Sequence, residues 1–416
     1  MLNQIKSRDI TNSTSTHLWA FLIGMSCGMP FILTSSTLKA WMSEAGMPIY
    51  VISFMNLLNL TYLLKFSWAP IFDKYHPVGF GRYKSWIIYM HLALGITLIV
   101  LSYCDPNKHF KLFTICAGLT AFMGANVTLS LDGYWIRFID RNNIQAFAGI
   151  TEVGYRLGKI ITGGIALVIA DFFNWHILYQ MSGLFFFILA GFLVFLPNIT
   201  SKNDDGIENE YNYKKLISVC WKSLYNYGGP ILILFLTTVK INEALEHSLL
   251  PVFMLRELSL SLASVGIITK VIGIVANMIG LMIAIKFINI WGYKKTLKHA
   301  IQLHLFSTLL LSLVSVIKVN QVEEIVIICL FDNIARGLIS TTLLSFYADK
   351  IAKRKSATQF SIYALVTGCS GILFAPIGGL IVYYISWTAL FVFSVFSTIP
   401  SYLALSRLND NLTVNH

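Results

Sequence analysis

The sequence predicts an all-α, polytopic membrane protein of twelve transmembrane helices in two halves. Three observations predict this class. The 416 residues are 56% hydrophobic and only 12% charged, whereas a soluble domain has about 25% charged residues. Apolar windows of about 20 residues, the length that crosses the hydrocarbon core, recur along the whole chain. A long polar insert at 198–223 divides these windows into two equal sets.

The predicted spans are apolar runs separated by polar loops. We expect the twelve spans at 17–38, 49–69, 86–103, 111–136, 145–170, 177–197, 226–247, 262–287, 296–317, 324–347, 357–383 and 385–406. The predicted domains are an N-terminal six-helix bundle over 1–197, a cytoplasmic linker over 198–223 and a C-terminal six-helix bundle over 224–416.

The basic residues set the predicted orientation. Lys and Arg concentrate in the loops on one side of the membrane, which include both termini and the polar insert. Because cytoplasmic loops carry the excess of basic residues, both termini are expected in the cytoplasm. The net charge of +11 therefore reflects orientation in the bilayer, and no nucleic-acid partner is expected. The polar stretch Met1–Thr16, followed by a long apolar run, predicts no cleaved signal peptide.

The two predicted halves share features at equivalent places. Three matches recur at nearly the same offset: Glu44 with Glu257, Gly81 and Lys84 with Gly292 and Lys295, and Phe147 and Gly158 with Phe360 and Gly371. This pattern indicates a duplicated six-span unit. Parallel six-span repeats are the architecture of major facilitator transporters, so the predicted fold class is a major facilitator fold of two six-helix halves.

Span five carries three charges on one side. Within Gly149–Asp171, Glu152, Arg156 and Lys159 are spaced by four and then three residues, which places them close to one helical face. A charge at membrane depth costs at least about 2.5 kcal/mol, so this face should meet protein or a water-filled cavity. We therefore expect Arg156 and Lys159 to point into a central cavity.

Other ionisable residues fall on the spans that line the cavity in major facilitator architecture, which are the first of each set of three. Span four has Asp132, span seven has Lys240 and Glu243, and span ten has Asp332 and Arg336. Membrane-buried ionisable groups commonly mark substrate or proton paths. Alternatively, the pairs in spans seven and ten only neutralise each other, because they are three and four residues apart. The sequence leaves both interpretations open.

Asp132 is the preferred proton-responsive carboxylate. The rival carboxylates each have a base three or four residues along their own helix, which should keep them ionised. Along its own helix Asp132 has only Arg137, five residues away and off its face. Burial without a close cation would let Asp132 bind a proton near neutral pH, unless a tertiary contact brings another cation near. The alternative places Asp132 in the cytoplasmic headgroup region. Lys65 lies close enough to the cytoplasmic end of its span to reach the membrane interface.

The loop between spans two and three has a degenerate acid and base pattern. In Ala69–Trp86, Asp73 is followed by Gly81, Arg82 and Lys84. A tight glycine turn and an acid–base latch need these residue types, so we expect this loop to close the cytoplasmic mouth. The alternative is an ordinary basic loop that obeys the positive-inside rule.

The chain resembles the AmpG muropeptide permease family over almost its whole length, from GMPFILTSSTLKAWMSEAG at 28–46 to the last span. Three stretches are specific: LKFSWAPIFDKYHPVGFGRYKSW at 64–86, GYRLGKIITGGIALVIAD at 154–171 and SATQFSIYAL at 356–365. The resemblance implies a bacterial inner-membrane carrier that imports anhydro-muropeptides for peptidoglycan recycling by symport with protons. The chain departs from the family in span four, where Thr128 replaces the first of two acids. Any coupling through span four would then depend on Asp132 alone.

The resemblance also implies an anionic glycopeptide substrate, whose carboxylates cationic side chains would hold. We expect substrate binding at Arg156, Lys159, Lys240, Asp332 and Arg336, and proton coupling at Asp132, Glu152 and Glu243. Protons and the lipid bilayer are the other expected partners. The carrier is expected to be a monomer without a metal or other cofactor.

Two other functions remain open. One is transport of another anionic amphiphile, such as an acetyl-CoA-like or siderophore-like solute, by the same fold. The other is a non-transporting membrane sensor or scaffold, which would have no need of ionisable residues inside its spans. No phosphate-cradling loop, metalloprotease motif or recognisable catalytic triad is present, so no enzyme is expected.

Overall fold

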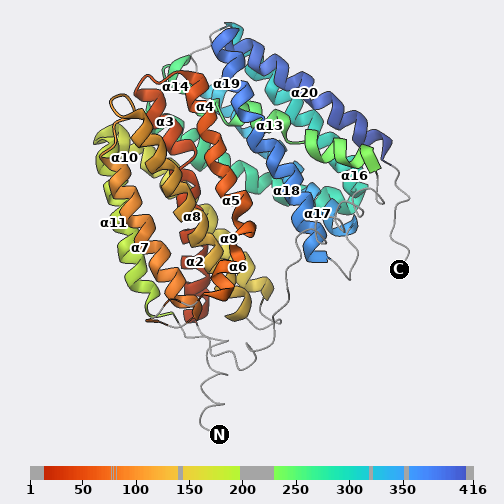
Figure 1. Ribbon diagram of the computed structural model, residues 1–416. Helices are drawn as coiled ribbons and strands as arrows, with labels where there is room; N and C mark the ends of the chain where they lie inside the picture. The colour runs from red at the N-terminus through yellow and green to blue at the C-terminus, as the bar shows by residue number, and fades with distance from the viewer. Residues whose placement is uncertain are drawn as a thin grey trace. The chain divides into compact units, whose positions relative to one another are not determined.

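Helices dominate the computed structural model (Figure 1), and the residues it describes contain no β-strand. The structure describes residues 14–75, 77, 79–80, 82–138, 144–196, 229–317, 322–350 and 356–408. Within these ranges, ten helices are long and apolar enough to cross a membrane. The prediction of an all-α membrane protein is therefore confirmed.

The chain folds as two compact units. Unit 1 comprises Met1–Met47, Leu58–Gly206 and Ser261–Lys270, and unit 2 comprises Pro48–Leu57, Ile207–Leu260 and Val271–His416. Each unit contains most of one predicted half and, in addition, a short segment from the other half of the sequence. The exchanged segments are the beginnings of predicted spans two and eight. The predicted linker at 198–223 lies outside the described residues.

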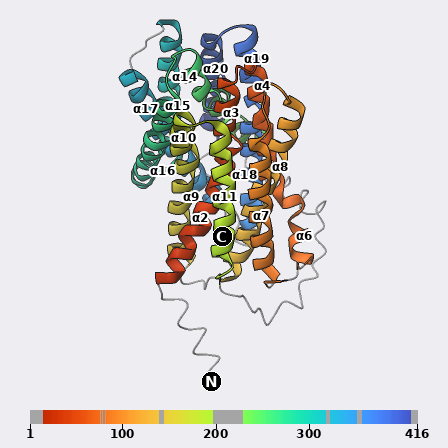
Figure 2. The ribbon, with the colours of Figure 1, turned by 90° about the vertical axis from the view of Figure 1, so that its left-hand side faces the viewer.

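Unit 1 contains long helices that run side by side (Figures 1 and 2). Its helices are α2 (Thr14–Leu33), α3 (Ser36–Glu44), α5 (Leu60–Leu64), α6 (Ala69–Lys74), α7 (Arg82–Ser102), α8 (Phe110–Phe138), α9 (Ile144–Ile160), α10 (Ala166–Phe172), α11 (Trp175–Leu193) and α15 (Leu262–Gly266). Helix α7 packs against α8 and α11, and α2 packs against α8 and α9. A π-helical turn, Ile161–Ile165, joins α9 to α10 and completes predicted span five.

Glycines bring the backbones of α2 and α9 into contact. A Cβ atom at Gly24 of α2 would lie 1.9 Å from the carbonyl oxygen of Thr151, and one at Gly154 of α9 would lie 2.2 Å from the carbonyl oxygen of Phe21. Only glycine permits so close an approach at either position. This contact fixes the face of α9 that carries Glu152 beside α2.

Unit 2 is assembled from the remaining helices. They are 229–238, α4 (Ile49–Phe54), α13 (Ile241–His247), α14 (Leu250–Arg256), α16 (Gly273–Ile317), α17 (Val322–Lys350), α18 (Ser356–Leu373), α19 (Ala375–Tyr384) and α20 (Trp387–Arg407). Helix α16 covers the later part of predicted span eight and all of span nine, and its backbone turns between them at Gly292, where φ is 76° and ψ is 164°. Glycine adopts this conformation without a steric penalty.

Predicted span seven is not one continuous helix. The helix over 229–238 ends before Lys240, whose φ of −105° and ψ of 3° are not helical, and α13 begins at Ile241. Helix α14 follows after a further short break. Discontinuous helices of this kind mark binding sites in many transporters, because they free backbone polar groups inside the membrane. The charged residues of span seven therefore lie at a break in the helix.

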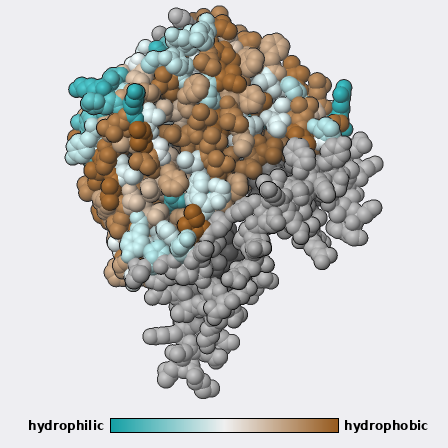
Figure 3. Space-filling view, viewed as in Figure 1, coloured by the Kyte–Doolittle hydropathy of each residue, from teal (hydrophilic) through white to brown (hydrophobic). Residues whose placement is uncertain are grey.

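Large apolar side chains cover much of the outside of the molecule. Ile96 on α7, Ile115 on α8 and Phe192 on α11 are all more than half exposed. Figure 3 shows hydrophobic residues predominating over the described surface in that view. An exposed apolar surface of this extent needs hydrocarbon around it, which agrees with a position in the bilayer.

Candidate functional site

Unit 1 contains a cavity of about 410 Å³, walled by residues of α2, α5, α8 and α9. The residues lining it are Gly24, Cys27, Phe31, Tyr62, Lys65, Thr128, Asp132, Thr151, Glu152 and Tyr155. The wall combines aromatic rings with hydroxyl and charged groups. A cavity of this size and composition is typical of small-molecule sites.

Asp132, on α8, is paired with a lysine. The Nζ atom of Lys65 lies 2.7 Å from Oδ2 of Asp132. A tertiary contact therefore brings a cation to Asp132, and the extension of Lys65 to the membrane interface stays a prediction. The physical reason for the contact is the 3₁₀ turn Lys65–Ser67, which ends α5 and directs the lysine toward α8. The side chains of Lys65 and Asp132 are 28% and 44% exposed, so the pair is only partly buried.

Helix α9 carries its charges at the edge of the cavity. Glu152 lines the cavity, and its Oε1 atom lies 2.9 Å from Nε of Arg156, as the four-residue spacing predicts. The Nζ atom of Lys159 lies 4.2 Å from the ring centroid of Tyr155, which is also a lining residue. Arg156 and Lys159 thus contact the cavity wall without being part of it. Their role in substrate binding stays a prediction.

The two predicted pairs of unit 2 form one network. Nζ of Lys240 lies 3.2 Å from Oε2 of Glu243, whose Oε1 lies 3.1 Å from Nη2 of Arg336. Nη1 of Arg336 lies 3.7 Å from Oδ2 of Asp332 and 2.6 Å from Nδ1 of His247. The spacing along each helix predicted both pairs. It did not predict that Arg336 joins them by bridging α13 and α17.

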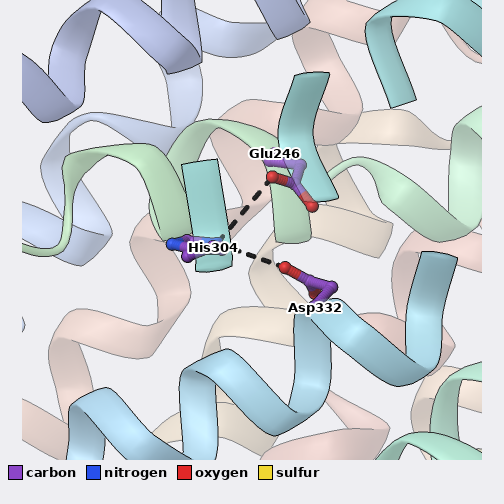
Figure 4. A group of neighbouring side chains, drawn as sticks. All are labelled: Glu246, His304 and Asp332. Atoms are coloured by element: carbon purple, nitrogen blue, oxygen red, sulfur yellow. Dashed lines mark ion pairs between the residues drawn. The ribbon is translucent and has the colours of Figure 1, made fainter. Parts of the chain in front are cut away.

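Asp332 of α17 also belongs to a cluster of three buried ionisable side chains, together with Glu246 of α13 and His304 of α16 (Figure 4). Nε2 of His304 lies 3.2 Å from Oδ1 of Asp332 and 3.9 Å from Oε2 of Glu246. Glu246 also accepts a 2.8 Å hydrogen bond from the hydroxyl of Thr308. Sequence analysis missed Glu246 and His304. The available signal was a glutamate three residues after Glu243 and a histidine in the middle of an apolar span.

The predicted gating loop is described only in part. Gly81 and the side chains of Asp73 and Arg82 lie outside the described residues. Lys84 is buried, and its Nζ donates a 2.8 Å hydrogen bond to the carbonyl oxygen of Leu196. This bond ties the start of α7 to the segment after α11 within unit 1. A role of the loop in gating stays a prediction.

Known proteins similar to this chain include several membrane transporters. The family model described as Major Facilitator Superfamily matches residues 16–376. The anhydromuropeptide permease of Escherichia coli (strain K12) is 24% identical over 410 residues, which cover 94% of this chain and 81% of the permease. Putative transporter AmpG 1 of Rickettsia conorii is 25% identical over 431 residues, which cover 97% and 100%. The crystal structure of nucleoside transporter NupG shares the fold with a TM-score of 0.73 at 14% identity, over 95% of this chain and 98% of NupG.

Proposed function

The chain belongs to the Major Facilitator Superfamily, and we propose that it is a proton-coupled carrier that imports anhydromuropeptides across the bacterial inner membrane. The observation that carries this proposal is the match to an anhydromuropeptide permease along 94% of the chain. Such a substrate joins sugar rings to a peptide with carboxylate groups. Its site therefore needs aromatic surfaces, hydrogen-bonding groups and cations.

The cavity of unit 1 offers surfaces for the sugar part. Phe31 and Tyr155 present aromatic rings, which are large apolar surfaces for a sugar face. The buried hydroxyl of Thr151 has no hydrogen-bond partner among the described residues. A buried hydroxyl without a partner costs stability, and a substrate hydroxyl in the cavity would remove that cost. These residues support sugar binding at this wall.

Cations beside the cavity are suited to hold the peptide carboxylates. Lys65 already pairs with Asp132, and Arg156 already pairs with Glu152. A substrate carboxylate would replace one carboxylate partner by another, so each cation keeps a charged hydrogen bond throughout. We assign substrate binding here to Arg156, with Lys159 beside it.

A second set of proposed substrate-binding residues lies in unit 2. Lys240 and Arg336 share the carboxylate of Glu243, and Asp332 contacts the guanidinium of Arg336 from the buried side. The side chains of Lys240 and Arg336 are partly exposed, at 29% and 12%. They are therefore accessible to an anion that approaches the broken helix.

Proton coupling and gating complete the proposal. Asp132, Glu152 and Glu243 are the carboxylates at which the sequence places proton coupling; each has a cation within 3.2 Å that stabilises its charged form, which makes each of them less suited to carry a proton. We assign closure of the cytoplasmic mouth to Asp73 and the turn Gly81–Lys84, with both termini in the cytoplasm. Asp73→Asn should then slow transport more than it weakens substrate binding. Unchanged turnover would reduce this loop to an orientation signal.

Uptake into proteoliposomes tests the proposed function. The purified chain is reconstituted, and labelled anhydromuropeptide is supplied with and without an imposed inward proton gradient. We expect the gradient to drive accumulation and a protonophore to abolish it. Arg156→Ala should lose uptake, whereas Lys111→Ala, at an exposed lysine of α8, should not. Uptake no greater than in protein-free vesicles, or gradient-driven uptake of acetyl-CoA instead, would refute the proposal.

A further inference from the structure

The buried cluster of Glu246, His304 and Asp332 has groups that its surroundings leave unsatisfied. Their relative exposures are only 1%, 3% and 0%. Oε1 of Glu246 and Oδ2 of Asp332 have no hydrogen-bond partner among the described residues, nor does Nε2 of His304 have a well-aligned one. One nitrogen or oxygen atom of each side chain lies within 4.8 Å of the corresponding atoms of the other two. A buried carboxylate oxygen without a donor is costly, so a further proton or cation at these oxygens would stabilise the cluster.

The charges around the cluster do not balance. Among the described residues, its charged and titratable neighbours come from two segments: Lys240, Glu243 and His247 from the start and body of α13, and Cys329 and Arg336 from α17. Helices α18, α19 and α20 also pack against α13, and within their described residues Arg407, in the last turn of α20, is the only charged side chain.

Counting these groups leaves one negative charge uncompensated. Two cations, Lys240 and Arg336, face three carboxylates when Glu246 and Asp332 are both ionised. His247 does not supply the missing charge, because its Nδ1 accepts from the guanidinium of Arg336, which has only donors. A buried ionised group without a partner is strongly destabilising. One added proton restores neutrality.

We propose that Glu246, His304 and Asp332 form a buried site that binds one proton, and that this proton is the one transported with the substrate. The inference rests on the proposed function in its second part only. The proton comes from water on one side of the membrane and returns to water on the other. Inside the cluster it is held between Nε2 of His304 and the carboxylate oxygens, so no bond other than to hydrogen forms or breaks.

Arg336 provides the link between this proton and the substrate. It contacts Glu243 on the partly exposed side and Asp332 on the buried side. A substrate carboxylate that binds Lys240 or Arg336 brings a negative charge close to the cluster, which favours its protonated form. By reciprocity, protonation of the cluster strengthens binding of the anion. Substrate and proton therefore bind together, as symport requires.

A metal cation is a less suitable occupant of the same site. The cluster lacks a single positive charge, whereas most metal ions in proteins carry two. The guanidinium of Arg336 also lies 3.7 Å from Oδ2 of Asp332, where it would repel a metal ion. Thr308 already donates to Oε2 of Glu246, so this oxygen needs no further cation. A proton fits these charges and contacts without displacing any group.

The first test needs no substrate. Proton uptake by the purified full-length chain in detergent is counted with a pH-indicator dye as the pH is lowered. Infrared bands of the carboxyl and imidazole groups report where the proton is held. We expect the wild-type chain to take up one proton that is lost in the Glu246→Gln, Asp332→Asn double variant. Glu323→Gln, which removes an exposed carboxylate at the start of α17, should keep it.

The outcomes of this titration separate the possibilities. Equal proton uptake by the wild-type chain and the double variant overturns the inference. So does uptake that depends on added Na⁺ or Zn²⁺, or on a chelator, since it would indicate a metal site. Because the double variant can fail to fold, Glu246→Asp serves as a second variant. It keeps a carboxyl group and should bind the proton with a shifted midpoint.

Transport by proteoliposomes tests the second part. Glu246→Gln should lose proton-driven accumulation of anhydromuropeptide to a much greater extent than exchange of labelled for unlabelled substrate, which needs no net proton movement. An equal loss of both would overturn the coupling role. If the wild-type chain itself does not transport anhydromuropeptide, the proposed function fails, while the titration still decides whether the proton site exists.

Discussion

Unit 1 and unit 2 hold their charged groups in opposite ways. Around the cavity of unit 1 the charges form separate pairs, in which the carboxylates of Asp132 and Glu152 are 44% and 54% exposed. In unit 2 the charges form one network whose inner members, such as Asp332, are completely buried. Exposed pairs contribute little to stability and exchange partners readily, whereas a buried charge depends on its partner.

From this difference we propose that the two units have different roles in transport. Cations that exchange one carboxylate partner for another are suited to a substrate that must enter and leave. A buried network that lacks one charge is suited to a small ion that binds without rearranging its neighbours. On this view unit 1 recognises the substrate mainly, and unit 2 couples recognition to the proton. Four experiments test this contrast.

The largest effect is expected from Arg336→Ala. It leaves Asp332 buried without its cation, and breaking a buried pair in this way costs about 3–5 kcal/mol of stability. Chemical unfolding in detergent measures the loss. Arg407→Ala, at an exposed arginine of α20, is the control and should leave the free energy of unfolding unchanged.

A second substitution shows whether this cost is electrostatic. Adding Asp332→Asn to Arg336→Ala removes the uncompensated carboxylate and should recover part of the lost stability. The comparison fails if Asp332→Asn recovers no stability and Arg336→Ala loses no more stability than Arg407→Ala. The ion pairs of unit 2 would then contribute as little to stability as those of unit 1.

The sequence was sufficient for contacts within a helix. Glu152 with Arg156, and Lys240 with Glu243, are four and three residues apart, and helical geometry alone brings them together. The twelve apolar windows likewise predicted the membrane fold, because the thickness of the bilayer fixes their length. Neither inference needs knowledge of how the helices pack.

Contacts between helices could not be predicted in this way. Lys65 and Asp132 belong to different helices, and their pairing depends on the packing of α5 against α8. The contact of His304 with Asp332 likewise requires α16 to pack on α17. The sequence therefore identified most of the ionisable residues, while their contacts with other helices came only from the structure; the assignment of the proton to Asp132 stays a prediction.

The next effect concerns the wall of the cavity and should be confined to unit 1. Gly154→Ala places a Cβ atom 2.2 Å from the carbonyl oxygen of Phe21, so α9 must move away from α2. Overpacking of this kind costs about 1–3 kcal/mol. The matched control is Gly149→Ala on the same helix, where a Cβ atom has no neighbour within 4 Å.

Unfolding and uptake are measured for both glycine variants. Gly149→Ala should be neutral or more stable by up to about 1 kcal/mol, because alanine favours helix. Gly154→Ala should also raise the apparent KM for substrate, since the cavity wall shifts. If both variants behave alike, the close contact of α2 and α9 does not shape the cavity.

A smaller effect is expected from Asp132→Asn. The pair with Lys65 is partly exposed, so its loss should change stability by about 0.2–1 kcal/mol. Because Lys65 then lacks its carboxylate partner, we expect the KM for substrate to change while proton-driven accumulation persists. The ratio of internal to external substrate at steady state measures this. Loss of accumulation with exchange retained would return the proton site to Asp132 and remove the division of work between the units.

The smallest effect is expected from Glu152→Gln, and its direction is informative. Glu152 is the more exposed partner of a pair within one helix, so its removal should cost no more than about 0.3–0.5 kcal/mol of stability. Arg156 would no longer have to leave a carboxylate before it binds one from the substrate. The apparent KM should therefore fall by about twofold, which is the same free energy expressed as binding. Glu323→Gln, at an exposed carboxylate of α17, should leave KM unchanged. A rise in KM for Glu152→Gln would show that Glu152 itself contacts the substrate and that the pairs of unit 1 do not exchange partners.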